Sequence, residues 1–164
     1  MSYVRLITQR ILDSFAEVVY VNRSSLYRVW LLTPWISGSN ERTDAVFSLA
    51  ETLASTKATL ILITRPPADA WHLRSLEVLR KSSNATAYLC KNLHVKLYIA
   101  ECDDFEVALL GSANLTARAN SVNKELALEL RSTGSNKNQS VSQVIAELKR
   151  YASELRGDDD VQLM

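Results

Sequence analysis

The run Ala58-Thr-Leu-Ile-Leu-Ile-Thr64 constrains the fold of this chain more than any other stretch. It is a continuous apolar run, and it is bounded by Lys57 on one side and by Arg65-Pro-Pro67 on the other. A short apolar run between such boundaries is typical of a strand that is covered on both faces. The chain is therefore expected to be an α/β protein in which helices cover both faces of a mixed β-sheet.

Helical and extended patterns alternate along the rest of the chain. Apolar residues recur at three- and four-residue steps from Val4 to Val18, which predicts an amphipathic first helix. Turn residues are expected at 37–40 and a polar loop at 134–139. Further helices are predicted at 43–53, 68–81 and 141–155, and strands at 28–33, 85–90, 92–101, 107–110 and 126–131. The predicted organisation is one domain over residues 1–156, followed by a disordered acidic tail over residues 157–164.

Composition places few limits on the partner. The 164 residues are 47% hydrophobic and 23% charged, with a net charge of +1, so no overall field attracts or repels nucleic acid. Two cysteines are too few for a disulfide framework, and a reduced, cytoplasmic setting is expected. Arg5, Arg10 and Asp13 interrupt any signal-peptide core, and no apolar run is long enough for a membrane anchor.

Three polar motifs in the second half of the chain carry the candidate chemistry. His94 and Lys96 are two residues apart in the predicted strand 92–101, where alternation would put both side chains on one face. The next predicted strand ends at Gly111-Ser-Ala-Asn114, which offers backbone N–H groups, a hydroxyl and a carboxamide. Asn123-Lys-Glu125 follows. Together these residues provide donors for a phosphate and a nucleophile or acid/base.

The ordered set resembles the phospholipase D superfamily, whose signature is His-x-Lys, an acidic residue after four positions, Gly-Ser-x-Asn, and a downstream Asn-x-Glu. Two features depart from that pattern. Glu101 stands where the family usually has Asp, and nine residues separate it from Gly111 where six are common. Asp104 has the usual six-residue separation.

The resemblance implies a phospholipase D-like sandwich and a metal-independent phosphodiesterase without a cofactor. The family unit needs two His-x-Lys motifs and this chain has one, so the resemblance implies a homodimer with a shared cleft. By the same resemblance, His94 of one subunit forms a phosphohistidine, and His94 of the other protonates the leaving group. Lys96 and Asn114 hold the phosphate oxygens, Ser112 supports them, and Glu125 accepts a hydrogen bond from an imidazole N–H.

The substrate is less constrained than the chemistry. The small single-motif size favours a nuclease, with DNA favoured over RNA, and phosphatidyl transfer is the alternative. Trp35 is a candidate wall of the cleft or a core residue capping the sheet, and Arg118, Lys124 and Lys91 are candidate backbone contacts or ordinary surface charges. Two further alternatives are a degenerate superfamily member that only binds its partner, and a chance pattern of polar strand ends and turns. His72 has no neighbouring metal-ligand residue and is assigned no metal role.

Overall fold

The structure is a computed structural model that describes residues 2–38, 44–81, 84–133 and 139–164. The strands are β1 (Tyr3–Ile7), β2 (Leu26–Leu32), β3 (Ile36–Ser37), β4 (Thr59–Thr64), β5 (Ala85–Cys90), β6 (Leu97–Cys102), β7 (Phe105–Gly111), β8 (Leu115–Thr116), β9 (Ala127–Thr133) and β10 (Val161–Leu163). The helices are α1 (Ile11–Val21), α2 (Ala45–Ala54), α3 (Ala70–Arg80), α4 (Ala117–Ser121) and α5 (Gln139–Arg156).

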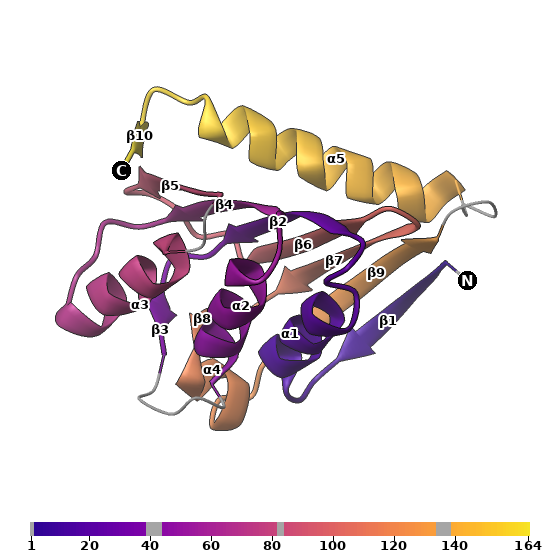
Figure 1. The fold of residues 1–164 in the computed structure, drawn as a ribbon, viewed down its shortest axis with the longest axis horizontal. Helices are drawn as coiled ribbons and strands as arrows, with labels where there is room; N and C mark the ends of the chain where they lie inside the picture. The colour runs from indigo at the N-terminus through magenta and orange to yellow at the C-terminus, as the bar shows by residue number, and fades with distance from the viewer. Residues whose placement is uncertain (1, 39–43, 82–83, 134–138) are drawn as a thin grey trace.

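An eight-stranded mixed sheet in the order β1-β9-β7-β6-β2-β4-β5-β10 forms the centre of the protein. Strands β2, β4 and β5 pair in parallel, and the other neighbours in this sheet pair antiparallel. Strands β3 and β8 form a small separate parallel pair. Helices α1, α2 and α3 lie on one face of the large sheet and α5 lies on the other (Figure 1). The predicted mixed sheet with helices on both faces is confirmed.

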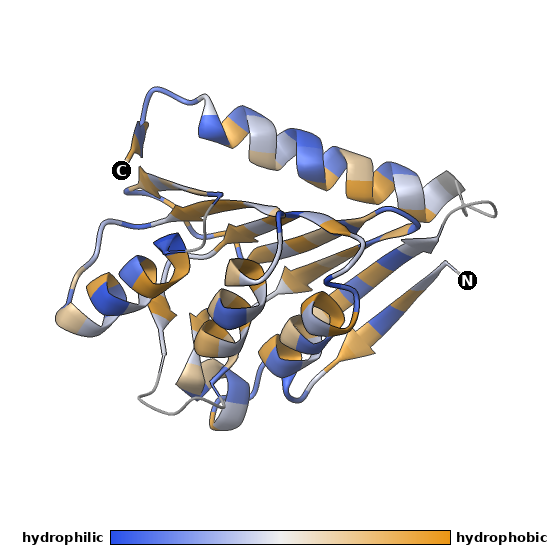
Figure 2. Ribbon diagram, viewed as in Figure 1, coloured by the Kyte–Doolittle hydropathy of each residue, from blue (hydrophilic) through white to orange (hydrophobic). Residues whose placement is uncertain are grey.

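Strand β4 has a buried core on each side, as its apolar sequence predicted. Leu60 and Leu62 pack in the core under α1 and α2, whereas Ile61 and Ile63 pack in the core under α5. All four are at most 5% exposed. Apolar residues therefore run almost without a break through the central strands, as Figure 2 shows.

The predicted first helix is wrong in its first half, where the chain forms strand β1. Val4 pairs with Leu130 and Leu6 with Leu128 in an antiparallel ladder, and helix α1 begins only at Ile11. Arg10 separates the two elements in the left-handed conformation, with φ 49°. The apolar spacing of residues 4–7 fits a strand as well as a helix, so pairing with β9 decides the outcome.

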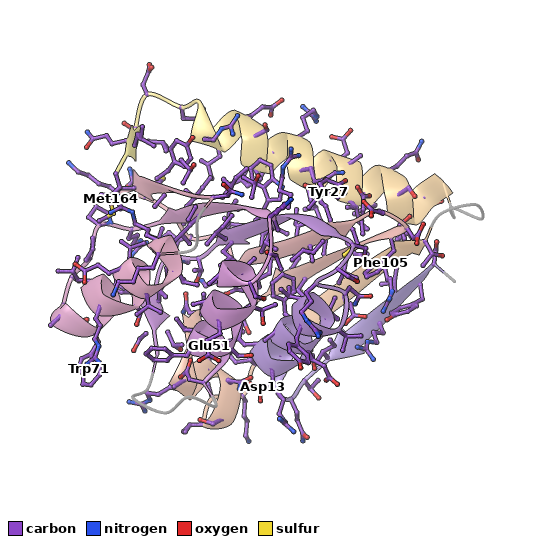
Figure 3. All side chains as sticks on the ribbon, viewed as in Figure 1. Asp13, Tyr27, Glu51, Trp71, Phe105 and Met164 are labelled. Atoms are coloured by element: carbon purple, nitrogen blue, oxygen red, sulfur yellow. The ribbon has the colours of Figure 1, made fainter. Side chains whose placement is uncertain are left out.

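The structure also differs from the prediction near residue 160. Val161–Leu163, within the predicted disordered tail, form β10 and pair antiparallel with β5. In the predicted helix 68–81, the apolar side chain of Trp71 extends away from the core (Figure 3) and is 49% exposed. Residues 39–40 of the predicted turn, the predicted helix start at residue 43, and loop residues 134–138 lie outside the described ranges.

Strand direction brings many loop residues to one end of the large sheet. Strands β1, β2, β4 and β7 finish there, and β6 and β9 begin there, because Leu97 pairs with both Leu32 and Leu110 while Ala127 pairs with Ile7 and Gly111. We call this the site end of the sheet. The opposite end, where β6 finishes at Cys102 and β7 begins at Phe105, is the far end.

Candidate active site

His94 and Lys96 lie at the site end, in the segment just before β6. The structure corrects the prediction that both belong to the strand, which begins at Leu97. The neighbouring strand β2 finishes at Leu32 and is followed by Thr33 and Pro34, and proline has no N–H with which to continue a ladder. The Lys96 carbonyl still accepts from Gly111 N at 3.2 Å, and Lys96 Nζ donates to the His94 carbonyl at 2.9 Å. The ammonium group therefore sits beside the exposed histidine.

Gly111 allows the second motif to approach the third. A Cβ atom at this position would lie 2.2 Å from the Leu126 carbonyl oxygen and 2.6 Å from the Cα of Ala127, so only glycine fits. The close approach lets Ser112 N donate to the Leu126 carbonyl at 2.9 Å. It also brings the Ser112 side chain next to Glu125.

Ser112, Asn123 and Glu125 form a bonded group. Ser112 Oγ donates to Glu125 Oε2 and accepts from Leu126 N at 3.0 Å, while Asn123 Nδ2 donates to Glu125 Oε1 at 3.1 Å. The Glu125 carboxylate is therefore fixed in orientation by two side chains. The resemblance implied an imidazole partner for Glu125, and within one chain the described contacts of its carboxylate are to Ser112 and Asn123.

Buried hydroxyl groups anchor the turn that carries Asn114. Tyr98, which is 2% exposed, donates from its hydroxyl to the Ala113 carbonyl at 2.7 Å. Burial raises the pKa of Tyr98, which keeps the phenol neutral and able to donate. On the other side of the turn, Leu115 N donates to Thr33 Oγ1 at 3.2 Å. Among the described residues, the buried Asn114 Oδ1 has no hydrogen-bond partner.

Trp35 follows β2 at the site end and is 37% exposed. Its ring packs against that of His72 with centroids 5.6 Å apart. His72 is 1% exposed, its Nε2 lies 3.1 Å from Thr64 Oγ1, and burial lowers its pKa although the charge of Asp69 opposes this. One part of Trp35 therefore packs on a buried histidine, and another part remains accessible.

Sequence analysis missed Arg65, whose side chain contacts the imidazole ring of His94. Its Nη2 is 2.8 Å from His94 Nε2, and its Nε donates to the Leu93 carbonyl at 2.8 Å. Arg65 directly follows the buried strand β4, whose end lies at the site end, so only the topology of the sheet identifies it as a neighbour of His94.

The three residues predicted to contact the nucleic-acid backbone lie in different parts of the structure. Lys124 lines a cavity of about 550 Å³ beside Glu125, and a second cavity of about 410 Å³ shares Thr8, Gln9, Asn123 and Glu125 with it. Arg118 is exposed on α4, and Lys91 is exposed in the turn after β5. Lys124 therefore lies beside the motif residues. Arg118 contacts them through its backbone, because Asn123 N donates to the Arg118 carbonyl at 2.9 Å, while no described contact joins Lys91 to them.

Glu101 is not part of this site. It lies near the far end of β6, 2% exposed, where Oε1 accepts from Trp30 Nε1 at 2.8 Å and Oε2 lies 3.1 Å from Lys149 Nζ. Asp104 is exposed in the β6–β7 turn at the same end. Five residues along a strand span roughly 17 Å, so neither acid can support Lys96 directly.

The described ranges contain no candidate metal site and no helix that could span a membrane. No group of three or more His, Cys, Asp or Glu side chains in these ranges could hold a metal ion. None of the helices described is long and apolar enough to cross a bilayer.

Solved structures with the same fold include two chains of similar length. NucT from Helicobacter pylori superposes with a TM-score of 0.69 at 17% identity, covering 94% of this chain and 95% of that one. Nuc, a phospholipase D family member from Salmonella typhimurium, gives 0.68 at 12% identity, covering 100% of this chain and 99% of that one. Phosphatidylserine synthase from Haemophilus influenzae gives 0.62 at 14% identity and covers 99% of this chain but 40% of that one.

Sequence comparison identifies the family. No curated protein sequence gives a significant match. The family model described as "cardiolipin synthase, PLD-like domain" matches residues 4–152, which run from within β1 into α5 and include every motif residue of the site end. The chain therefore belongs to the phospholipase D superfamily.

Proposed function

We propose that the protein is a metal-independent phosphodiesterase that cleaves DNA. The observation that carries this proposal is the gathering of His94, Lys96, Ser112, Asn114 and Glu125 at one end of the sheet, with Lys96 Nζ bonded to the backbone of His94. A phosphodiester needs a nucleophile and donors around the charge that develops on its oxygens. An imidazole, an ammonium group and a carboxamide meet these needs.

The reaction proceeds in two displacements. His94 Nε2 attacks phosphorus, the bond to the leaving oxygen breaks, and that oxygen takes a proton from a second imidazole. The second imidazole then removes a proton from water, whose oxygen displaces His94 and releases the phosphate monoester. Lys96 and Asn114 bind the non-bridging oxygens in both steps.

The second imidazole comes from a second copy of the chain, because each chain supplies one motif. A row of apolar side chains beside the site supports this assembly. Leu6, Leu128 and Leu110 are cross-strand neighbours, and they are 60%, 41% and 39% exposed. Leu126, 49% exposed, extends the row to Glu125. We call these four leucines the apolar strip and propose that it packs against the other subunit.

The choice of DNA rests on size and on the surroundings of the motifs. The chain has nearly the length of NucT and Nuc, whereas it spans 40% of the phosphatidylserine synthase. The cavities beside Glu125 are lined mostly by polar residues, Lys124 among them, with Ile11, Ala119 and Leu126 as the apolar members, and this lining suits a phosphate backbone better than acyl chains. Phosphatidyl transfer is the second candidate, because the matching family model is described as cardiolipin synthase.

Purified protein assayed in excess EDTA against plasmid DNA, single-stranded DNA, RNA and phosphatidylcholine vesicles tests the proposal. DNA cleavage should persist in EDTA and disappear in His94→Asn, with DNA binding retained. Loss of activity in chelator with rescue by Mg²⁺ or Mn²⁺ would exclude the metal-independent reaction. Cleavage of the vesicle lipid alone would establish the second candidate instead.

Mixing of subunits tests the shared cleft. After complete exchange of wild-type and His94→Asn chains, only the wild-type homodimer has both imidazoles in one cleft. Activity should therefore fall as the square of the wild-type fraction. A linear fall would show that each subunit carries an independent site.

A further inference from the structure

Arg65 is a basic residue of the site end that the sequence motifs do not include. Strand β4 finishes at Thr64, and Pro66 restricts the backbone of Arg65 to extended conformations, so the side chain leaves the strand end in a limited range of directions. It is half-buried, and the carbon of its guanidinium group lies 6.0 Å from the centre of the Trp35 ring. The site-end packing thus restricts where the guanidinium group can lie.

The hydrogen bonds of Arg65 specify the protonation of His94. Arginine only donates, so His94 Nε2, 2.8 Å from Arg65 Nη2, must be the acceptor and carry no proton. The proton of the neutral ring then lies on Nδ1. An unprotonated Nε2 has the lone pair that attack on phosphorus requires, and Nδ1–H can donate to a carboxylate such as Glu125 of either subunit.

The same guanidinium group lies where the phosphate must arrive. A phosphorus atom that approaches His94 Nε2 has to displace Arg65 Nη2 from that lone pair, which leaves the N–H group next to the non-bridging oxygens. Nε remains bonded to the Leu93 carbonyl at 2.8 Å and can act as the pivot. Among the described residues Nη1 makes no hydrogen bond, so the group has the two parallel donors that match phosphate geometry.

We propose that Arg65 positions His94 in its nucleophilic tautomer in the free protein and then transfers its guanidinium group to the phosphate of the bound substrate. This transfer also frees Nε2 of the second subunit's His94 to take up the proton that it later gives to the leaving oxygen. This role rests on the proposed function, since it assigns a further residue to the same reaction. Lys96 and Arg65 would then bind the phosphate from different strands, one beside β6 and the other after β4.

Nitrogen NMR of the imidazole rings tests the first half without any substrate. Wild-type protein at about pH 8, where an ordinary histidine is neutral, should show His94 protonated on Nδ1. Arg65→Ala should shift the ring toward the Nε2-protonated form, and Arg74→Ala, which removes an exposed arginine on α3, should leave it unchanged. An unchanged His94 spectrum in Arg65→Ala would overturn the proposal, even if the protein proves not to be a phosphodiesterase.

Inorganic phosphate serves as the probe for the second half. Arg65→Ala should weaken phosphate binding about tenfold and lower kcat/KM about 10–100-fold, the usual cost of losing a residue that orients a site group. Added guanidinium ion at low millimolar concentration should restore part of the activity, and Arg65→Lys, which keeps the charge without the planar fork, should lie between the two. Equal phosphate binding by Arg65→Ala and Arg74→Ala would overturn the transfer to phosphate. Phosphate binding through Arg65 in a wild-type protein that cleaves no phosphodiester would instead refute the proposed function alone.

Discussion

Strand β6 connects two polar regions of opposite character. Before its first residue, His94 is exposed and Lys96 half-buried, and the contacts of their side chains are to Arg65 and to a backbone carbonyl. Near its last residue, Glu101 is 2% exposed and accepts hydrogen bonds from both Trp30 and Lys149. The polar side chains at one end of the strand therefore have few hydrogen-bond partners, whereas the charge at the other end is buried and paired.

The difference separates a reactive site from a structural one. Glu101 also lies 3.3 Å from Tyr27 Oη and 3.5 Å from Arg28 Nη1, and Tyr27 lies beneath α5 (Figure 3). Burial and the Glu101 charge raise the pKa of Tyr27. Burial alone would lower the pKa of Lys149, but its bonds to Glu106 and Glu101 outweigh burial and raise it. Such mutually satisfied groups attach α5 to the sheet and have no capacity left for a ligand.

If the second chain packs at the site end, a charged residue introduced into the apolar strip should lower activity more than any other change. Leu128→Glu should dissociate the dimer and lower activity by about 10²–10⁴-fold, because the monomer lacks the second imidazole. The thermal midpoint of the monomer should change little, since Leu128 is 41% exposed.

Val144→Glu is the matched control, since Val144 is 46% exposed on α5. Sedimentation and nuclease activity should be measured on both variants. A Leu128→Glu protein that remains dimeric and active would assign the interface to another surface.

The next largest effect should come from Lys96. Lys96→Ala removes a donor to the phosphate and should lower kcat by about 10²–10³-fold with little change in the urea midpoint. Glu101→Ala should lower the activity per folded molecule far less, because it acts at the far end. Equal losses in two folded proteins would mean that the far end takes part in catalysis.

Stability should show the reverse ranking. Glu101→Gln should lower the free energy of unfolding by about 1–3 kcal/mol, since it leaves Lys149 with one carboxylate and weakens the bond to Trp30. Lys149 is partly exposed, which keeps this loss below that of a fully buried pair. Urea unfolding of Glu101→Gln and Lys96→Ala should be compared at pH 7. A larger destabilisation in Lys96→Ala would contradict the assignment of the structural role to the far end.

The smallest predicted effect concerns His72, the buried support of the site end. Its folded pKa lies below the ordinary value of 6.5, so its contribution to stability is complete above about pH 6.5 and is lost as the pH falls through that value toward the folded pKa. The stability of wild type should therefore decrease more between pH 7 and pH 5 than that of His72→Gln. Parallel pH profiles of the two proteins would show that His72 does not titrate during unfolding.

The local sequence pattern was sufficient to predict the elements whose own apolar residues determine which faces are buried. The continuous run of β4, the apolar positions Val46 and Leu49 of α2, and the long amphipathic pattern of α5 all predicted the observed elements. β1 and β10 are short edge strands, and their conformation depends on partners 128 and 71 positions away, Tyr3 with Arg131 and Val161 with Cys90. No local pattern contains that information.

Motif order predicted which residues gather at the site end but misplaced Glu101 and missed Arg65. Spacing in a motif is counted along the chain, whereas a strand converts that spacing into distance away from the site. Arg65 is 29 residues from His94 in sequence and reaches it only because β4 and β2 finish at the end where β6 begins. The topology of the sheet had to be known before this neighbour could be recognised.

Strand β10 covers the edge of β5 and so should protect the protein from aggregation. Without it, β5 would be an open edge whose unpaired N–H and C=O groups could template pairing with other molecules. β10 has three residues and follows Asp158, Asp159 and Asp160, so the new outer edge is short and adjoins negative charge. Deletion of residues 158–164 should therefore leave catalysis intact while promoting aggregation on storage, which light scattering would detect.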